Sequence, residues 1–122
     1  MVIEVGMCDE SISEAYVELN NGELGLEAAK RALDVARTAD NQLRIMWSSY
    51  HLGKAQLLLK DFEQAESSLT TARYLAQATE QINFKFLVFV EEEEANLMRL
   101  TNRIEAAEAI ERRLTTIREI LG

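Results

Sequence analysis

The chain has 122 residues, which is enough to bury one hydrophobic core but too few for several domains. It has no proline and five glycines, and it is rich in Ala, Leu, Glu, Gln and Arg, so the composition favours an all-helical protein. The net charge of −8 argues against a nucleic-acid-binding surface, which needs clustered Lys and Arg, and favours a basic or apolar partner.

Three further features bear on where the protein works. Its single cysteine, Cys8, cannot form an internal disulfide, so a reducing compartment is the simpler assumption. The first seven residues carry Glu4 and no basic residue, unlike a secretory signal. The longest apolar run, Ile82 to Val90, includes Lys85 and is too short to span a bilayer. We therefore expect a cytoplasmic protein without a membrane segment.

The first predicted helical hairpin covers approximately residues 6–39. Its first helix starts near Asp9 and ends at a turn formed by Asn20-Asn21, and its second helix runs from about Glu23 to Thr38. Gly25 lies early in the second helix, where glycine costs roughly 1 kcal/mol relative to alanine. The helical pattern is therefore weaker here than in the next hairpin.

The second predicted hairpin covers approximately residues 41–78 and has the clearest pattern. Asp40-Asn41 precedes its first helix, which runs to about Lys60. The second helix begins at Phe62 and runs to about Ala78, with its apolar residues at helical spacing. Such a short break between two helices predicts an antiparallel pair.

Two local features support this hairpin. Asp61 is expected to accept hydrogen bonds from backbone N–H groups at the start of the second helix, with Gln64 as the return arm of a capping box. Small residues let the two helices approach closely; they are Gly53, Ala65 and Ala72.

The third predicted hairpin covers approximately residues 80–121. Thr79 is expected to cap its first helix, which runs from about Glu80 to Thr101. Asn102 and Glu105 form a second capping-box pattern, which predicts the start of the last helix.

The segment Ile82 to Val90 allows two interpretations. It is rich in β-branched and aromatic residues that partly alternate, so taken alone it could form a strand. The rest of the chain contains no other strand candidate, and a lone strand would leave its backbone groups unpaired. We therefore expect a helix that is buried on more than one side.

The second hairpin resembles the tetratricopeptide repeat, whose signature is W-x2-L-G-x2-Y in the first helix and A-x3-F in the second. Ser49 stands where the signature has Trp, and Gln56 where it has Tyr. The residues that carry the resemblance are Leu52, Gly53, Ala55, Phe62, Ala65, Leu69 and Ala72.

The resemblance implies a single domain over residues 1–122 with three hairpins. The equivalent positions Ser13, Gly53 and Ala95 are separated by 40 and 42 residues, which is longer than the usual period of about 34. This is similar to the long-helix variant of the family. The implied fold is all-α, with six helices in three antiparallel hairpins that stack as a right-handed superhelix.

No pattern in the sequence indicates catalysis or a cofactor. His51 is the only histidine, and one histidine with Cys8 does not make a zinc site. Gly22 and Gly25 precede neither Lys-Ser nor Lys-Thr, so there is no phosphate-binding loop. We expect a protein that is not an enzyme and has no cofactor or bound metal.

Four consecutive glutamates, Glu91 to Glu94, lie in the fifth predicted helix. Successive helical residues are rotated by about 100°, so these side chains point around nearly the whole helix. At least one carboxylate is therefore expected to face a neighbouring helix or the groove, either in an ion pair with Arg99 or a nearby Lys or as part of an acidic patch.

In the tetratricopeptide family, ligands usually lie in the concave groove lined by the first helix of each hairpin. Transferred to this sequence, the inner face takes residues at spacing i, i+3, i+7. Trp47 and Phe89 could equally be inter-repeat packing residues. The predicted partner-binding residues are Glu14, Trp47, Tyr50, Lys54, Phe89, Glu92, Asn96 and Arg99, and the same registers include Met7, Glu10, Val17 and Leu57.

The function implied by this resemblance is a non-catalytic scaffold that binds a protein or peptide, as part of a larger signalling or regulatory protein. A peptide with Lys or Arg beside apolar residues is the expected ligand class. The first alternative is a self-association domain that forms a homodimer. The second is a small-molecule sensor, which would need an enclosed apolar pocket under Ile82 to Val90.

Overall fold

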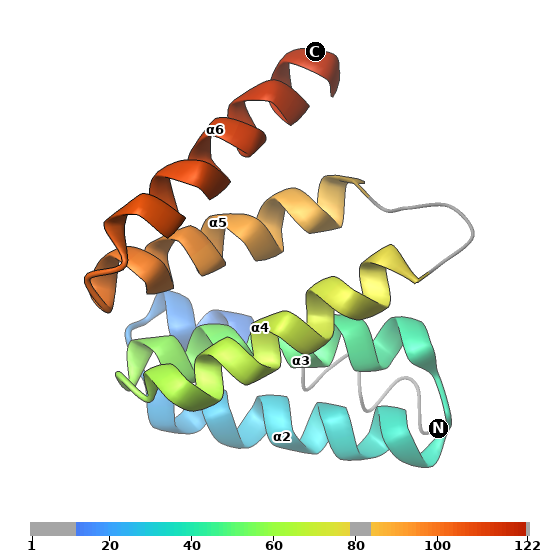
Figure 1. The fold of residues 1–122 in the computed structure, drawn as a ribbon. Coiled ribbons are helices and arrows are strands. Elements are labelled where there is room, and N and C mark those ends of the chain that lie inside the picture. The colour runs from blue at the N-terminus through green and yellow to red at the C-terminus, as the bar shows by residue number, and fades with distance from the viewer. Residues whose placement is uncertain (1–11, 79–83, 122) are drawn as a thin grey trace.

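The computed structural model describes residues 12–78 and 84–121 (Figure 1). These residues are helical apart from the turns, and no strand occurs among them. The helices are a short segment at residues 12–18, α2 (Gly22–Thr38), α3 (Gln42–Leu58), α4 (Phe62–Gln77), α5 (Phe84–Leu100) and α6 (Ile104–Leu121). The all-helical prediction is confirmed, and the described part of the ambiguous apolar segment, from Phe84 on, belongs to a helix. Thr79, the predicted cap, lies outside the described residues.

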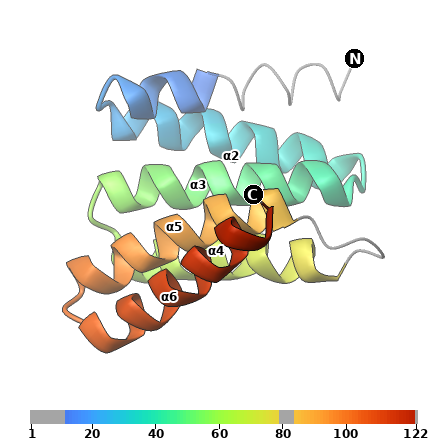
Figure 2. The ribbon, with the colours of Figure 1, turned by 90° about the horizontal axis from the view of Figure 1, so that it is seen from above.

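The helices form three antiparallel hairpins that stack in chain order (Figures 1 and 2). Residues 12–18 pair with α2, α3 with α4, and α5 with α6. Between hairpins, α2 packs on α3 and α4 on α5, and α3 also touches α5. This arrangement is the predicted stack of three hairpins.

Helix α3 is enclosed on several sides. Every residue from Ser48 to Gly53 is buried, because α2, α4 and α5 all contact this helix. The largest apolar cluster joins α3 to α4 and α5, and a smaller one joins α2 to α3. The larger cluster contains Met46, Tyr50, Leu57, Ala65, Leu69, Ala72, Ala76, Phe86, Leu87, Val90 and Leu97. The smaller contains Ala29, Leu33 and Leu52.

Helices α3 and α4 approach each other closely at Gly53. A Cβ atom added there would lie 2.8 Å from both Cγ and Cδ2 of Leu69, which is fully buried. Ala65 and Ala72 on α4 are also fully buried. The expectation that small residues allow these helices to pack closely is therefore confirmed.

The four described turns share one geometry. Each contains a residue with positive φ, and the N–H of the next residue donates to the carbonyl five positions earlier, as in a Schellman motif. The positive-φ residues are Asn20, Asp40, Lys60 and Asn102. The donor N–H groups of Asn21, Asn41, Asp61 and Arg103 reach the carbonyls of Tyr16, Ala36, Gln56 and Met98 at 2.7, 3.0, 2.9 and 2.7 Å.

Two capping predictions are wrong in detail. Asn102 does not open α6; it occupies the left-handed position that ends α5, and Arg103 is the residue before α6. Asp61 is the N-cap of α4, but its side chain makes no capping hydrogen bond, so no capping box forms with Gln64. The turns at Asn21 and Asn41 agree with prediction, since these side chains accept from the N–H groups of Leu24 at 3.3 Å and Arg44 at 3.1 Å.

The Gly53–Leu69 contact predicts that alanine at position 53 destabilises the protein, although alanine has the higher helix propensity. Gly53→Ala should lower the free energy of unfolding by up to about 2 kcal/mol, because overpacking costs about 1–3 kcal/mol and removing a helical glycine returns only about 1 kcal/mol. In a Leu69→Ala background the same change should instead stabilise. Urea unfolding followed by circular dichroism measures both, with the exposed Thr70→Ala as a control. Stabilisation by Gly53→Ala in both backgrounds would contradict the contact.

The turn at Lys60 predicts a stabilising substitution. The left-handed backbone conformation costs lysine roughly 1–2 kcal/mol of conformational free energy, whereas it costs asparagine less and glycine nothing. Lys60→Gly should therefore raise the free energy of unfolding by about 1 kcal/mol, and the matched change Asn102→Gly should raise it by less. Equal effects at the two positions would show that the backbone conformation does not limit stability at Lys60.

Candidate functional site

The first helices of the three hairpins line a common hollow. It has a volume of about 300 Å³ and lies where the C-terminal ends of segment 12–18, α3 and α5 meet. Its walls are Val17, Lys54, Leu57, Leu58, Lys60, Phe62, Glu93, Asn96 and Leu100. Val17, Lys54, Leu57 and Asn96 come from the three predicted inner-face registers, so the structure brings these registers together.

Two of the predicted groove residues are mainly packing residues. Tyr50 is 8% exposed, and its ring lies 5.6 Å from that of Phe86 on α5. Trp47 is half-buried, and its ring lies 4.6 Å from the Phe86 ring in an edge-on arrangement. Trp47 therefore makes the inter-repeat contact that was its alternative interpretation.

The other predicted residues divide between the hollow and α6. Phe89 is 40% exposed but does not line the hollow. Arg99 forms a two-pronged ion pair with Glu111 of α6, with Nε donating to Oε2 at 3.1 Å. Glu92 pairs with Arg118 of α6. Both side chains therefore connect α5 to the last helix.

The environment of Tyr50 changes the pKa of its hydroxyl. Burial raises the pKa of the Tyr50 hydroxyl, and the carboxylates of Glu93, Glu92 and Glu14 raise it further. Glu14 and Glu92, predicted as groove residues, are thus close enough to act electrostatically on it. Lys54 lies over the same ring, with its Nζ 5.3 Å from the centroid.

The four consecutive glutamates point in different directions, as predicted. Glu91 accepts from Nε of Arg113 on α6 at 3.0 Å, and Glu94 accepts from Nε of Arg73 on α4 at 3.2 Å. Both carboxylates belong to buried residues. The run therefore joins α5 to two neighbouring helices, and neither buried carboxylate is available as an acidic patch.

Glu93 differs from the rest of this run. It is half-buried in the wall of the hollow, and it forms no hydrogen bond or close ion pair with any residue in the described ranges. Burial raises the pKa of its carboxyl, which nearby Lys54 lowers and Glu92 raises. The hollow thus contains a partly desolvated carboxylate that has no direct partner within residues 12–78 and 84–121.

Sequence reasoning did not single out Glu93 or the apolar wall around it. Leu58, Phe62 and Leu100 come from helix ends that the inner-face registers leave out. The signal that could have found them is the turn geometry, because the end of each first helix lies beside the hollow. Glu93 could have been found only by knowing that its three neighbours take other partners.

No group of three or more His, Cys, Asp and Glu side chains within residues 12–78 and 84–121 could hold a metal ion. None of the helices in these ranges combines the length and hydropathy that a bilayer crossing requires. Comparison with protein-family models, with curated proteins and with solved structures finds no match to the chain.

His51 is a buried neutral imidazole. Its ring stacks on Trp47, with centroids 6.2 Å apart, and lies 5.4 Å from the Tyr50 ring. Burial, with a smaller contribution from the charge of Lys54, lowers its pKa to about 4. The ring therefore packs against the other aromatic side chains of α3.

This environment predicts a pH dependence of stability. Because the folded-state pKa lies below the unfolded value of about 6.5, the unfolded chain takes up a proton first as the pH falls. Stability should therefore decrease by about 1 kcal/mol between about pH 8 and about pH 5.5. Glu93 and Glu94, whose pKa values are raised, change stability with pH in the opposite direction. The His51 contribution is therefore measured as the difference between the pH-dependent free energies of unfolding of wild type and His51→Gln. An imidazole NMR titration with a midpoint near 6.5 would contradict the buried neutral form.

Proposed function

We propose that this chain is a non-catalytic binding module of the tetratricopeptide type. It holds an extended protein or peptide segment in the groove on its first helices, and it works in the cytoplasm. The observation that carries the proposal is the half-buried Glu93 carboxylate, without a direct partner among the described residues, inside a hollow with apolar walls.

The charge of the hollow favours a cationic residue in the ligand. A desolvated carboxylate gains most from a partner that brings opposite charge and hydrogen-bond donors. The C-terminal ends of segment 12–18, α3 and α5 meet here, and helix C-termini carry partial negative charge. Lys54 and Lys60 at the edge limit how many cations the site accepts. A single Lys or Arg fits this balance.

The walls favour apolar residues beside that cation. Leu100 is 54% exposed, and Val17, Leu58 and Phe62 are partly buried around the same hollow. Covering such surface on binding removes apolar area from water, at about 25 cal/mol per Å². The expected ligand is therefore an extended segment in which a Lys or Arg is flanked by residues such as Leu.

A peptide titration tests this function. Fluorescence anisotropy would compare a labelled ten-residue peptide containing Leu-Lys-Leu with versions containing Leu-Glu-Leu and Ala-Lys-Ala. We expect the first to bind most tightly, and its affinity to fall with salt because the charges are partly exposed. Glu93→Gln should weaken it about ten-fold. Glu119→Gln, an exposed carboxylate on α6, should leave it unchanged.

Two outcomes would count against the proposal. Equal binding of the Leu-Lys-Leu and Leu-Glu-Leu peptides would remove the role of Glu93. A concentration-dependent dimer in sedimentation velocity that Leu100→Ser dissociates would show that the groove is a self-association surface. Trp47 and Tyr50 are unsuitable for such variants, because both pack against Phe86 and their truncation would damage the core.

A further inference from the structure

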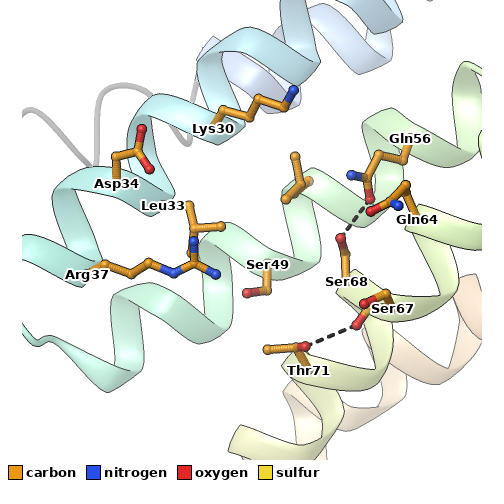
Figure 3. A pocket seen from close by; sticks show the side chains of 11 residues that line it. Lys30, Leu33, Asp34, Arg37, Ser49, Gln56, Gln64, Ser67, Ser68 and Thr71 are labelled. Carbon is orange, nitrogen blue, oxygen red and sulfur yellow. Dashed lines mark hydrogen bonds between the residues drawn. The ribbon is translucent and has the colours of Figure 1, made fainter.

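A second hollow lies on the other side of α3. It has a volume of about 360 Å³, with α3 as its floor and α2 and α4 as its walls (Figure 3). The floor residues Ser49, Leu52 and Gln56 are on the opposite face of α3 from Lys54 and Leu58, which line the groove. The two hollows are therefore separate sites, and neither contains a residue of the apolar segment 84–90.

The floor carries polar side-chain atoms that are open to the hollow and have no partner among the described residues. Ser49 is 3% exposed, lines the hollow, and makes no hydrogen bond with any residue of the described ranges. Gln56 is 7% exposed, and its Oε1 accepts from the Ser68 hydroxyl at 2.6 Å. Its amide nitrogen has no partner in the described part of the chain. Because no buried side-chain nitrogen or oxygen of the described residues lacks a partner, these atoms are accessible from the hollow, where a ligand or water can complete their hydrogen bonds.

These floor residues also explain why there is space. Ser49 and Gln56 occupy the positions at which the repeat signature has Trp and Tyr. Serine replaces a large ring by a hydroxyl, so the volume between α2 and α4 stays open and has a polar floor. Roughly 300–1,000 Å³ is the usual size of a small-molecule site.

The wall from α2 supplies positive charge. Lys30 and Arg37 both line the hollow, and neither forms an ion pair with a residue in the described ranges. Figure 3 shows the Arg37 guanidinium and the Ser49 hydroxyl directed toward one another, with the Asp34 carboxylate directed away from them. With two cations and the one carboxylate of Asp34, the lining is net positive, in a chain of net charge −8.

The rest of the lining suits hydroxyl groups. Gln64, Ser67 and Thr71 of α4 add neutral hydrogen-bonding groups, and Asp34 adds an acceptor. The Thr71 hydroxyl donates to the Ser67 carbonyl at 3.0 Å, so its oxygen can still accept a hydrogen bond. A ligand with one anionic group and several hydroxyls would match donors at the Arg37 end and acceptors elsewhere.

We infer that this hollow binds a small hydroxylated oxyanion, of the class of a sugar or polyol phosphate. The anionic group lies between the Arg37 guanidinium and the Ser49 hydroxyl, and the Gln56 amide donates to a neighbouring oxygen. This site is independent of peptide binding in the groove.

An NMR titration tests the site directly. Amide spectra of the ¹⁵N-labelled chain would be followed with glucose 6-phosphate, inorganic phosphate and glucose as probes, at constant ionic strength adjusted with sodium chloride. We expect saturable shifts at Ser49, Gln56 and Arg37 with glucose 6-phosphate, weaker binding of inorganic phosphate, and weaker binding of glucose. Arg37→Gln should reduce glucose 6-phosphate affinity about ten-fold or more, because it removes a charge-assisted hydrogen bond.

Two further variants separate binding from structure. Ser49→Ala should weaken binding about three-fold without lowering the melting temperature, because the hydroxyl has no partner in the described chain. Lys85→Gln removes an exposed cation on α5 and should leave affinity unchanged. The inference fails if glucose 6-phosphate gives no saturable shift up to about 10 mM, if glucose binds equally well, or if Arg37→Gln and Lys85→Gln have the same effect.

Discussion

The enclosure of α3 is the constraint on which the rest of the molecule depends. This helix contacts α2, α4 and α5, so its side chains must pack on nearly every side. Gly53 meets this demand toward α4, where a larger residue would collide with Leu69. Tyr50 and Trp47 meet it toward α5 through Phe86. Both hollows lie beside this helix, where the three neighbours do not fill the space completely.

Ion pairs add to the apolar packing that holds the last hairpin. Arg73 and Arg113 bind the buried carboxylates of Glu94 and Glu91 from opposite sides, and Arg103 forms a two-pronged pair with Glu66 on α4. Exposed pairs of this kind contribute little, but a buried carboxylate needs its cation to remain ionised without a large cost. The glutamate run thus serves mostly as structure, which leaves Glu93 as its member available to a ligand.

Much of the architecture could be predicted because it is encoded locally. Helical spacing identified the hairpins, and Asn20-Asn21 and Asn41 marked turns through their own backbone and capping chemistry. The inner-face register was implied by the resemblance to the repeat family, and two of its residues, Lys54 and Asn96, line the same hollow. Arg99 and Glu92 could not be placed in this way, because their partners lie on α6. Whether each side chain faces the groove or forms an ion pair depends on the tertiary structure. The second hollow depends on three helices at once.

The shared turn geometry has a consequence for how such a chain can grow. Asn20, Asp40 and Lys60 are spaced twenty residues apart, and the turns within the first two hairpins have the same geometry as the turn that connects these hairpins. The elementary module is therefore one helix and its turn. Duplication of a single module would keep every turn intact. In every later hairpin, however, the helix that lined the groove would lie on the outer face, and the outer helix would line the groove. Duplication of two modules would preserve both the turns and the position of each helix. A continuous groove therefore requires that helices are gained or lost in even numbers.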